Sequence, residues 1–350
     1  MKALPTLIKR ERLLRLAAVL FTLVLLSTVV LIVENMLISF VLAFGATYLI
    51  TPIVRYLERM GMSRNSAILI PYFTLLALTT ALVFITIPLV VEQIRELRLE
   101  MPKYVEGVTF LIQKWENQLK DFIPYVFKYD IGENIARLAE SGVTGFLQNA
   151  PKFAQQFLTV CLLGPIFCYF MLKDGRKISR NLLSLFPNNV FEMALSLSHK
   201  INLQLGDFIR ARLVEAFIVG IVVWIGLTIL QFPYALFLAI FATVMNLIPY
   251  VGPFIGAVPA FIIAIINQEP SLNVLLMSMV YFIAQLVDIV FIIPLVVART
   301  VNLHPVTVIV VFIIGANVMG VLGMIISVPV ASVLKLIFYT IYDQLIKFRA

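Results

Sequence analysis

The chain contains the run Asn246-Leu247-Ile248-Pro249-Tyr250-Val251-Gly252-Pro253-Phe254-Ile255-Gly256, in which helix-breaking residues interrupt strongly apolar sequence. A later run, Asn317-Val318-Met319-Gly320-Val321-Leu322-Gly323-Met324-Ile325-Ile326-Ser327, repeats the spacing: a breaker three residues after the asparagine and a glycine six residues after it. Interruptions at matching positions of two hydrophobic segments are the best sequence indication of a transport site built from broken helices. Chance similarity between two apolar segments is the alternative.

The composition indicates an all-α polytopic membrane protein. The chain is 61% hydrophobic and 13% charged, with a mean hydropathy of +1.01, whereas soluble domains are about half apolar and a quarter charged. The net charge of +8 comes from basic residues beside apolar segments, where membrane topology explains them, so no nucleic-acid partner is expected. No nucleotide-binding loop, zinc signature or nucleophile motif occurs. We therefore expect no enzyme activity, cofactor or metal site.

About eight hydrophobic segments are predicted. A membrane-spanning helix needs about 20 apolar residues, and six runs approach this length: Leu16–Val33, Met36–Val54, Ala67–Val91, Phe153–Leu172, Leu213–Gln231 and Leu272–Val297. Two longer regions, Tyr234–Asn267 and Val306–Ile346, contain the interrupted runs. One continuous helix over the first region would reach about 51 Å, beyond a hydrocarbon core about 30 Å thick. A bent pair of half-helices fits that region better.

The distribution of basic residues predicts the orientation of these segments. Lysines and arginines gather at segment ends that are expected in the cytoplasm, at residues 2–15, 55–64, 173–212, 299 and 347–349. Both termini are then cytoplasmic. The first interrupted region starts and ends outside, the second starts and ends inside, and each is expected to be a re-entrant hairpin that follows a span. This arrangement is an inverted repeat. The second region is also long enough for two full spans, and that alternative stays open.

Four regions are predicted along the chain. Residues 1–91 hold three spans, 92–152 form an external helical subdomain, 153–212 hold the fourth span and a cytoplasmic amphipathic helix, and 213–350 form a C-terminal transport half with two span-plus-hairpin units. Pro102 and Pro124 are expected to divide the external subdomain into shorter helices. The amphipathic helix, Asn188–Arg212, has one apolar face and is expected to lie along the membrane interface.

The run that begins at Asn246 and extends to Ala260 resembles the signature of the autoinducer-2 exporter (AI-2E) family of bacterial membrane proteins. Other residues fit the same family: Pro52, Arg64, Gly164-Pro165, Lys173-Asp174-Gly175, Gln285, Pro294, Leu303-His304-Pro305, Gly315, Gly320, Gly323 and Pro329. The resemblance covers nearly the whole chain. One departure is visible, because the family's cytoplasmic helix commonly ends in a Tyr-x-x-Gly-Gln-like segment where this chain has Asp207–Arg212.

The resemblance implies a secondary transporter or permease, a homo-oligomer in the lipid bilayer of the bacterial inner membrane. The implied activity is export of a small polar organic molecule such as a signalling compound. Similar proteins are also associated with Na⁺(Li⁺)/H⁺ antiport, so an antiporter with Na⁺ or H⁺ as coupling ion is an alternative. A non-transporting membrane scaffold is a second alternative.

Candidate pathway residues lie in the interrupted runs and in the preceding span. Asp288 lies inside the apolar segment Leu272–Val297 and shares a helix face with Gln285. Since an intramembrane carboxylate is costly, Asp288 is expected either to carry a coupling ion or to be hydrogen-bonded structurally inside the bundle. The other candidates are Asn246, Pro249, Gly252, Pro253, Gly256, Asn317, Gly320 and Gly323, each of which has tight packing or backbone capping as its structural alternative.

Three further residues are noted at the cytoplasmic side. Arg299 and His304 follow the Leu272–Val297 segment and are candidates for a gate, with a topology anchor and a structural turn as the alternatives. Glu215 begins an outward-running span and is expected to pair with Arg212 or Arg210.

Overall fold

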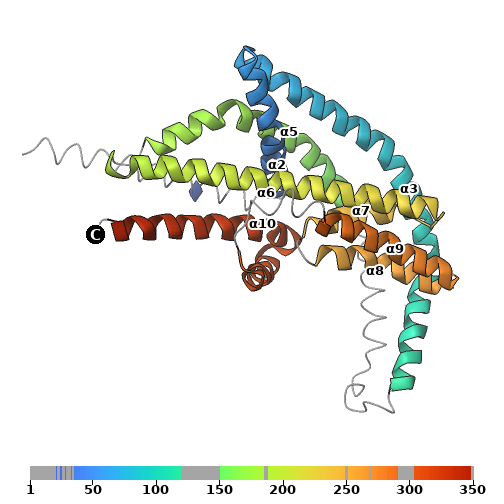
Figure 1. Ribbon diagram of the computed structural model, residues 1–350. Coiled ribbons are helices and arrows are strands. Elements are labelled where there is room, and N and C mark those ends of the chain that lie inside the picture. The colour runs from blue at the N-terminus through green and yellow to red at the C-terminus, as the bar shows by residue number, and fades with distance from the viewer. Residues whose placement is uncertain are drawn as a thin grey trace, which may run out of the picture. The chain divides into compact units, whose positions relative to one another are not determined.

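The computed structural model describes residues 35–119, 150–184, 188–248, 251–267, 270–290 and 303–347, with a few isolated positions between 21 and 33. Every regular element in these ranges is helical, which confirms the predicted all-α class (Figure 1). The helices are α2 (Met36–Arg59), α3 (Arg64–Leu119), α5 (Ala150–Leu183), α6 (Asn188–Ile229), α7 (Ala235–Asn246), α8 (Gly252–Ile266), α9 (Ser271–Val287) and α10 (Pro305–Lys347). The first predicted span falls almost wholly outside the described ranges.

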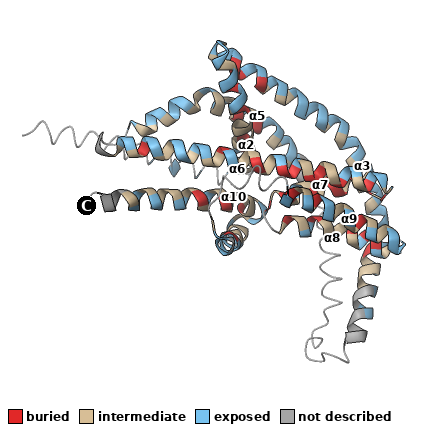
Figure 2. Cartoon of the chain, in the orientation of Figure 1, coloured by how far each residue is buried: buried red, intermediate tan, exposed pale blue. Residues whose placement is uncertain are grey.

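Six helices in the described part of the chain are long and apolar enough to cross a membrane. They are α2, α3, α5, α6, α9 and α10, whereas α7 and α8 are apolar but shorter. The most apolar stretch of α3 contains no buried residue, and exposed positions run along this helix in Figure 2. An apolar surface of this kind suits contact with lipid rather than water.

Two helices continue where the sequence predicts a boundary. α3 passes through Pro102 without interruption and extends to Leu119, so the expected break at this proline is wrong, while Pro124 lies outside the described residues. Proline removes one backbone hydrogen bond, but its fixed φ is compatible with a helix. α6 joins the predicted amphipathic segment to the following span in one helix of 42 residues, since no proline interrupts it.

The helices group into two compact units. Unit 1 contains residues up to Leu78, Gln155–Arg210 and the chain from Arg299 onward, and unit 2 contains Thr79–Ala154 and Ala211–Ala298. The predicted transport half, residues 213–350, is thus divided between both units. The four predicted regions themselves stay a prediction.

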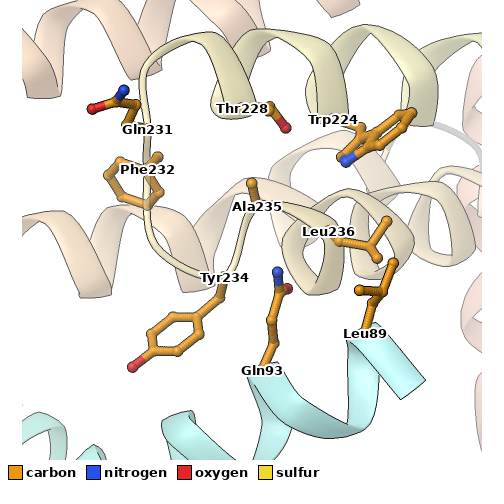
Figure 3. A pocket seen from close by; sticks show the side chains of 9 residues that line it. All are labelled: Leu89, Gln93, Trp224, Thr228, Gln231, Phe232, Tyr234, Ala235 and Leu236. Carbon is orange, nitrogen blue, oxygen red and sulfur yellow. The ribbon is translucent and has the colours of Figure 1, made fainter. Parts of the chain in front are cut away.

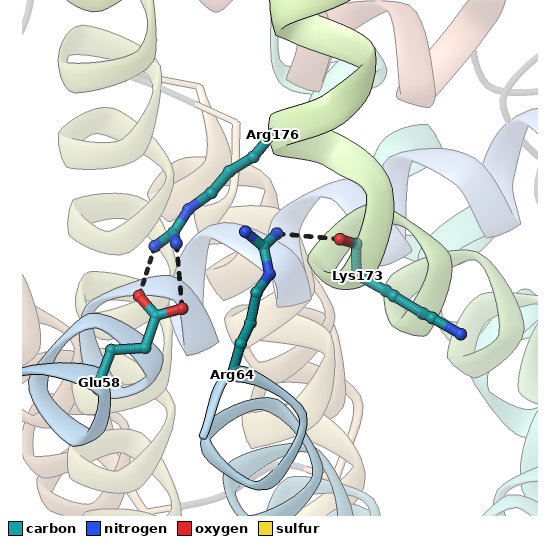
Figure 4. A network of polar contacts seen from close by, with 4 residues as sticks. All are labelled: Glu58, Arg64, Lys173 and Arg176. Atoms are coloured by element: carbon teal, nitrogen blue, oxygen red, sulfur yellow. Dashed lines mark hydrogen bonds and ion pairs between the residues drawn. The ribbon is translucent and has the colours of Figure 1, made fainter. Parts of the chain in front are cut away.

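Unit 1 is held together by a small apolar core and by polar contacts at one end of its helices. Its core comprises Ala43, Ile50, Val54, Ala67, Ile68 and Cys168. Arg176 on α5 forms a two-pronged ion pair with Glu58 on α2, with Nη1–Oε1 and Nη2–Oε2 distances of 3.0 and 2.6 Å (Figure 4). Arg64 donates a hydrogen bond of 2.9 Å to the carbonyl oxygen of Lys173. These contacts connect α5 to the turn between α2 and α3.

Unit 2 contains the larger core. Its fully buried side chains come from α6, α7, α8 and α9 and include Val223, Leu227, Leu238, Ala264 and Met277. Alanines and glycines at the contacts allow close approach of these helices: an added Cβ on Gly226 would lie 2.4 Å from Val280 Cγ1. The broken segment of the chain is therefore part of a tightly packed four-helix contact.

Candidate functional site

The first interrupted run forms a hairpin of two short helices. α7 ends at Asn246 and α8 begins at Gly252, with Pro253 in its first turn. The helices run antiparallel, since an added Cβ on Gly252 would lie 2.0 Å from the Met245 carbonyl oxygen and one on Gly256 would lie 3.1 Å from Ala242 Cα. Glycine is required at both contacts because backbone approaches backbone. Pro249, in the connection, lies outside the described residues.

The second interrupted run forms a sharp break inside α10. Met319 and Gly320 leave the helical conformation, and Gly320 has a φ of +59° and ψ of −140°, a region that is essentially restricted to glycine. The chain turns back at this point: Gly315 and Gly323 are eight residues apart, about 12 Å in a straight helix. Here an added Cβ on Gly323 would lie 2.0 Å from the Gly315 carbonyl oxygen. Both interrupted runs are thus true breaks in helices.

The two asparagines at these breaks have different surroundings. Asn246 is 2% exposed, and its side-chain nitrogen has no hydrogen-bond partner among the described residues. Asn317 is exposed, and its side-chain nitrogen donates to the Ile313 carbonyl oxygen one turn earlier, at 2.9 Å. A buried donor without a partner is costly. Of the two asparagines, Asn246 is therefore the one whose side-chain N–H groups have no acceptor among the described residues.

A buried group of charges connects α6 to α9. Arg212 Nη1 contacts Glu215 Oε1 within α6, so Arg212 is the partner of Glu215, while Arg210 binds Asp207 at 2.5 Å instead. The carboxyl group of Asp288 lies within hydrogen-bonding reach of the Glu215 carboxyl group. Glu215 is 2% exposed and Asp288 is 4% exposed. We call Arg212, Glu215 and Asp288 the carboxyl–guanidinium cluster.

Arg212 and Glu215 were not predicted as pathway residues. Their i, i+3 spacing at the start of an apolar run predicts a pair, but their contact with Asp288 depends on how α6 packs against α9. Asp288 itself opens a wider, π-type turn that continues α9 to Val290. Such turns are rare and frequently occur at functional sites.

Helix contacts place this cluster and the α7–α8 break at a similar level of unit 2. Gly220 of α6 faces Thr243 of α7, and Gly226 faces Val280 of α9. Both partner helices run opposite to α6, and a helix rises 1.5 Å per residue. Asn246 and Asp288 then both lie within about one helical turn of the level of Glu215. Glu215, Asn246 and Asp288 each have a buried polar atom without a hydrogen-bond partner among the described residues, and all three are therefore near the break.

Other predicted site residues are less closely connected to this region. Gln285 is half-buried on α9, one turn before Asp288. The His304 Nδ1 atom accepts a hydrogen bond of 3.3 Å from the Val306 N–H, at the start of α10, which fits the structural alternative for this histidine. Arg299 lies outside the described residues. Asn317, Gly320 and Gly323 belong to unit 1, whereas Asn246, Asp288 and the first hairpin belong to unit 2.

A cavity of about 330 Å³ lies at the other end of α7. Figure 3 shows its lining, which includes the polar side chains of Gln93, Thr228 and Gln231 together with Trp224. None of the predicted pathway residues lines it. Gln93 of α3 accepts a hydrogen bond of 2.9 Å from the Phe237 N–H in the first turn of α7, so α7 is capped at this end by a side chain from another helix.

Replacing this cap with an apolar side chain of similar size, Gln93→Leu, is expected to lower the free energy of unfolding by about 1 kcal/mol. The Phe237 N–H would lose its acceptor where the helix offers none of its own. Thermal unfolding of the purified protein in detergent measures the effect. Gln113→Leu, at an exposed site of the same helix, is the control. Equal unfolding of both variants and wild type would contradict a capping role for Gln93.

Long apolar helices around a broken pair define a multi-pass helical membrane protein. The sequence matches the family described as AI-2E family transporter over residues 20–343, so the chain belongs to the AI-2E family of transporters, as the resemblance predicts. It is 28% identical over 308 residues to "Putative transport protein YrrI" of Bacillus subtilis, covering 87% of this chain and 86% of that protein.

Other relatives extend over similar lengths. The chain is 29% identical over 313 residues to "Putative transport protein YueF" of Bacillus subtilis, covering 86% of this chain and 83% of that protein. It is 23% identical over 311 residues to "Putative permease PerM" of Escherichia coli K12, covering 87% of this chain and 86% of the relative. These names specify transport and no substrate.

Proposed function

We propose that this protein is a secondary transporter that exports a small polar organic molecule and binds it at the break between α7 and α8. The observation that carries the proposal is the side-chain nitrogen of Asn246, which is buried and without a hydrogen-bond partner at that break. A donor left unused in apolar surroundings costs about 1–3 kcal/mol. A polar solute that accepts its hydrogen bond would offset this penalty.

The first turn of α8 favours a polar rather than an anionic solute. The Gly252 and Ile255 N–H groups already donate to the carbonyl oxygens of Ile248 and Val251, at 3.1 Å each, and Pro253 has no N–H to offer. The start of a helix attracts anions through such donors. The amide of Asn246 is, by contrast, a buried donor without a hydrogen-bond partner among the described residues.

The lengths of the broken helices support the proposed re-entrant geometry. α7 has 12 residues and α8 has 15, which correspond to about 18 and 22 Å, short of a hydrocarbon core about 30 Å thick. A tight antiparallel pair of this length can enter and leave on one side. With the break in α10 as its counterpart, the two form the proposed inverted repeat, with both termini cytoplasmic and the chain assembled as a homo-oligomer.

Ion antiport is the second candidate, and the buried carboxyl–guanidinium cluster favours it. Carboxylates inside a membrane protein commonly mark ion pathways and proton relays. An exchanger of Na⁺ or Li⁺ for H⁺ would use Glu215 and Asp288 directly, whereas a solute exporter would use them only for coupling. A scaffold without transport would need neither the cluster nor the unpaired Asn246.

Reconstitution in liposomes distinguishes these functions. Wild-type protein is tested for efflux of labelled small polar solutes and for proton movement after addition of Na⁺ or Li⁺. If Asn246 binds the solute, Asn246→Leu should lower solute efflux by about tenfold or more, since one lost hydrogen bond of about 1.4 kcal/mol has this effect. Its stability should hold or rise, because the buried amide nitrogen that it removes has no hydrogen-bond partner among the described residues.

Thr243→Val is the matched control on the same helix. Its hydroxyl group already donates to the Ala239 carbonyl oxygen at 2.7 Å, so the loss should leave solute efflux nearly unchanged. Wild-type efflux in Asn246→Leu would remove the α7–α8 break as the binding site. Proton movement on Na⁺ or Li⁺ addition without efflux of any solute would favour the antiporter, and no flux of either kind would favour the scaffold.

A further inference from the structure

The carboxyl–guanidinium cluster contains more acidic than basic groups. Glu215 and Asp288 face each other from different helices, and Arg212 contacts Glu215. The guanidinium group of arginine stays protonated in proteins. With both carboxyl groups ionised, a net negative charge would be buried in an apolar region, where charges are costly unless they are paired.

No other described group supplies the missing positive charge. α7 and α8 contain no ionisable residue, and Tyr281 is the only titratable group of α9 before Asp288. Arg212 and Asp288 are the charged groups that act on Glu215, and Arg212 and Glu215 are those that act on Asp288. The hydroxyl group of Tyr281 has no hydrogen-bond partner among the described residues.

The chemistry of two neighbouring carboxyl groups indicates where a proton would lie. Two carboxylates can only accept hydrogen bonds, so a bond between them requires a proton on one of the two. The Oε2 atom of Glu215 and the Oδ1 atom of Asp288 have no donor among the described residues, although both side chains are more than nine-tenths buried. One proton between the carboxyl groups would provide a donor and bring the cluster to neutrality.

We propose that Glu215 and Asp288 share a single exchangeable proton, held beside Arg212, and that this pair is the proton-binding site of the protein. When the proton leaves, an uncompensated negative charge remains on the pair and attracts a cation or water to it. The use of this proton to drive transport rests on the proposed function, whereas its presence does not. The level of the pair, near the α7–α8 break, would let proton release and solute binding influence each other.

Infrared spectroscopy of the purified protein in lipid nanodiscs tests the proposal directly. Protonated carboxylic acids have a carbonyl stretching band at higher frequency than carboxylates and amides, and this band shifts in D₂O. Wild type is expected to show the band at neutral pH and to lose it at alkaline pH. Glu215→Gln and Asp288→Asn should each abolish the band, because the remaining carboxylate is then balanced by Arg212. Loss in both single variants indicates a shared proton.

Conservative and surface variants provide the controls. Asp288→Glu keeps a carboxyl group and should keep the band with a changed frequency, which separates proton binding from a packing defect. Asp207→Asn removes a half-exposed carboxylate that pairs with Arg210 and should leave the band unchanged. Absence of the band in wild type at neutral pH, or its persistence there in both amide variants, would overturn the proposal. A band in protein that shows no flux would retain the proton site and reject the proposed transport function.

Discussion

Gly252→Ala is expected to lower the free energy of unfolding by about 3 kcal/mol, the upper end of the usual range for overpacking. The added methyl group would lie 2.0 Å from the Met245 carbonyl oxygen and 3.0 Å from Asn246 Cα. Both neighbours are backbone atoms, which cannot move aside as a flexible side chain does. The α7–α8 hairpin would have to open, and the packing of α8 against α7 would be lost with it.

Thermal unfolding in detergent, compared with Gly175→Ala, measures this effect. No atom would lie within 4 Å of a Cβ on Gly175, which is inside α5. Alanine has a higher helix propensity than glycine by about 1 kcal/mol, so this control should be neutral or more stable than wild type. A Gly252→Ala protein that unfolds at the wild-type temperature would show that the two helices are not in backbone contact at the break.

Arg212→Met is expected to destabilise the protein by about 3–5 kcal/mol, the range for breaking a buried ion pair from one side. Glu215 would keep its buried position without the cation that it contacts. Replacing the whole cluster, as Arg212→Met, Glu215→Leu and Asp288→Leu together, should recover much of the loss, because a buried charge group exchanged for apolar side chains is often neutral in stability. This triple variant should be inactive in any ion-coupled flux.

The exposed ion pair of unit 1 provides the control for this experiment. Arg176 is about half exposed at 52%, and it pairs with Glu58. Arg176→Met should therefore cost about 1 kcal/mol or less, as surface pairs generally do. If Arg212→Met and Arg176→Met lowered the free energy of unfolding in detergent equally, the charges of the buried cluster would contribute no more to stability than an exposed ion pair does.

Several features could be predicted because they depend on local properties of the chain. The two breaks were located from asparagine, glycine and proline spacing, since these residues alter the backbone wherever they occur. Gly320 with its positive φ and the interruption between Asn246 and Gly252 are at the expected positions. The same residues carried the family resemblance, which the match over residues 20–343 confirms.

Other features could not be predicted because they depend on how helices continue and pack. The spacing rules give Asn246 and Asn317 the same role, yet one is buried without a partner for its nitrogen and the other is exposed and bonded to Ile313. The spacing of asparagine, glycine and proline within one run does not specify which side of the helix faces a neighbouring helix. The change in polarity along α6 predicts a boundary between an amphipathic segment and a span, whereas the helix continues through residues 188–229.

The sequence by itself determined the membrane class, the helical content, the family and the positions of the breaks. Each follows from hydropathy or from backbone restrictions that act over a few residues. Only the tertiary structure decided that Glu215 meets Asp288 and that both lie near the level of Asn246. Those contacts join helices far apart in the chain, and they depend on the register in which α6 packs against α7 and α9. Small residues such as Gly220 and Gly226 set that register through close contacts that no local pattern encodes.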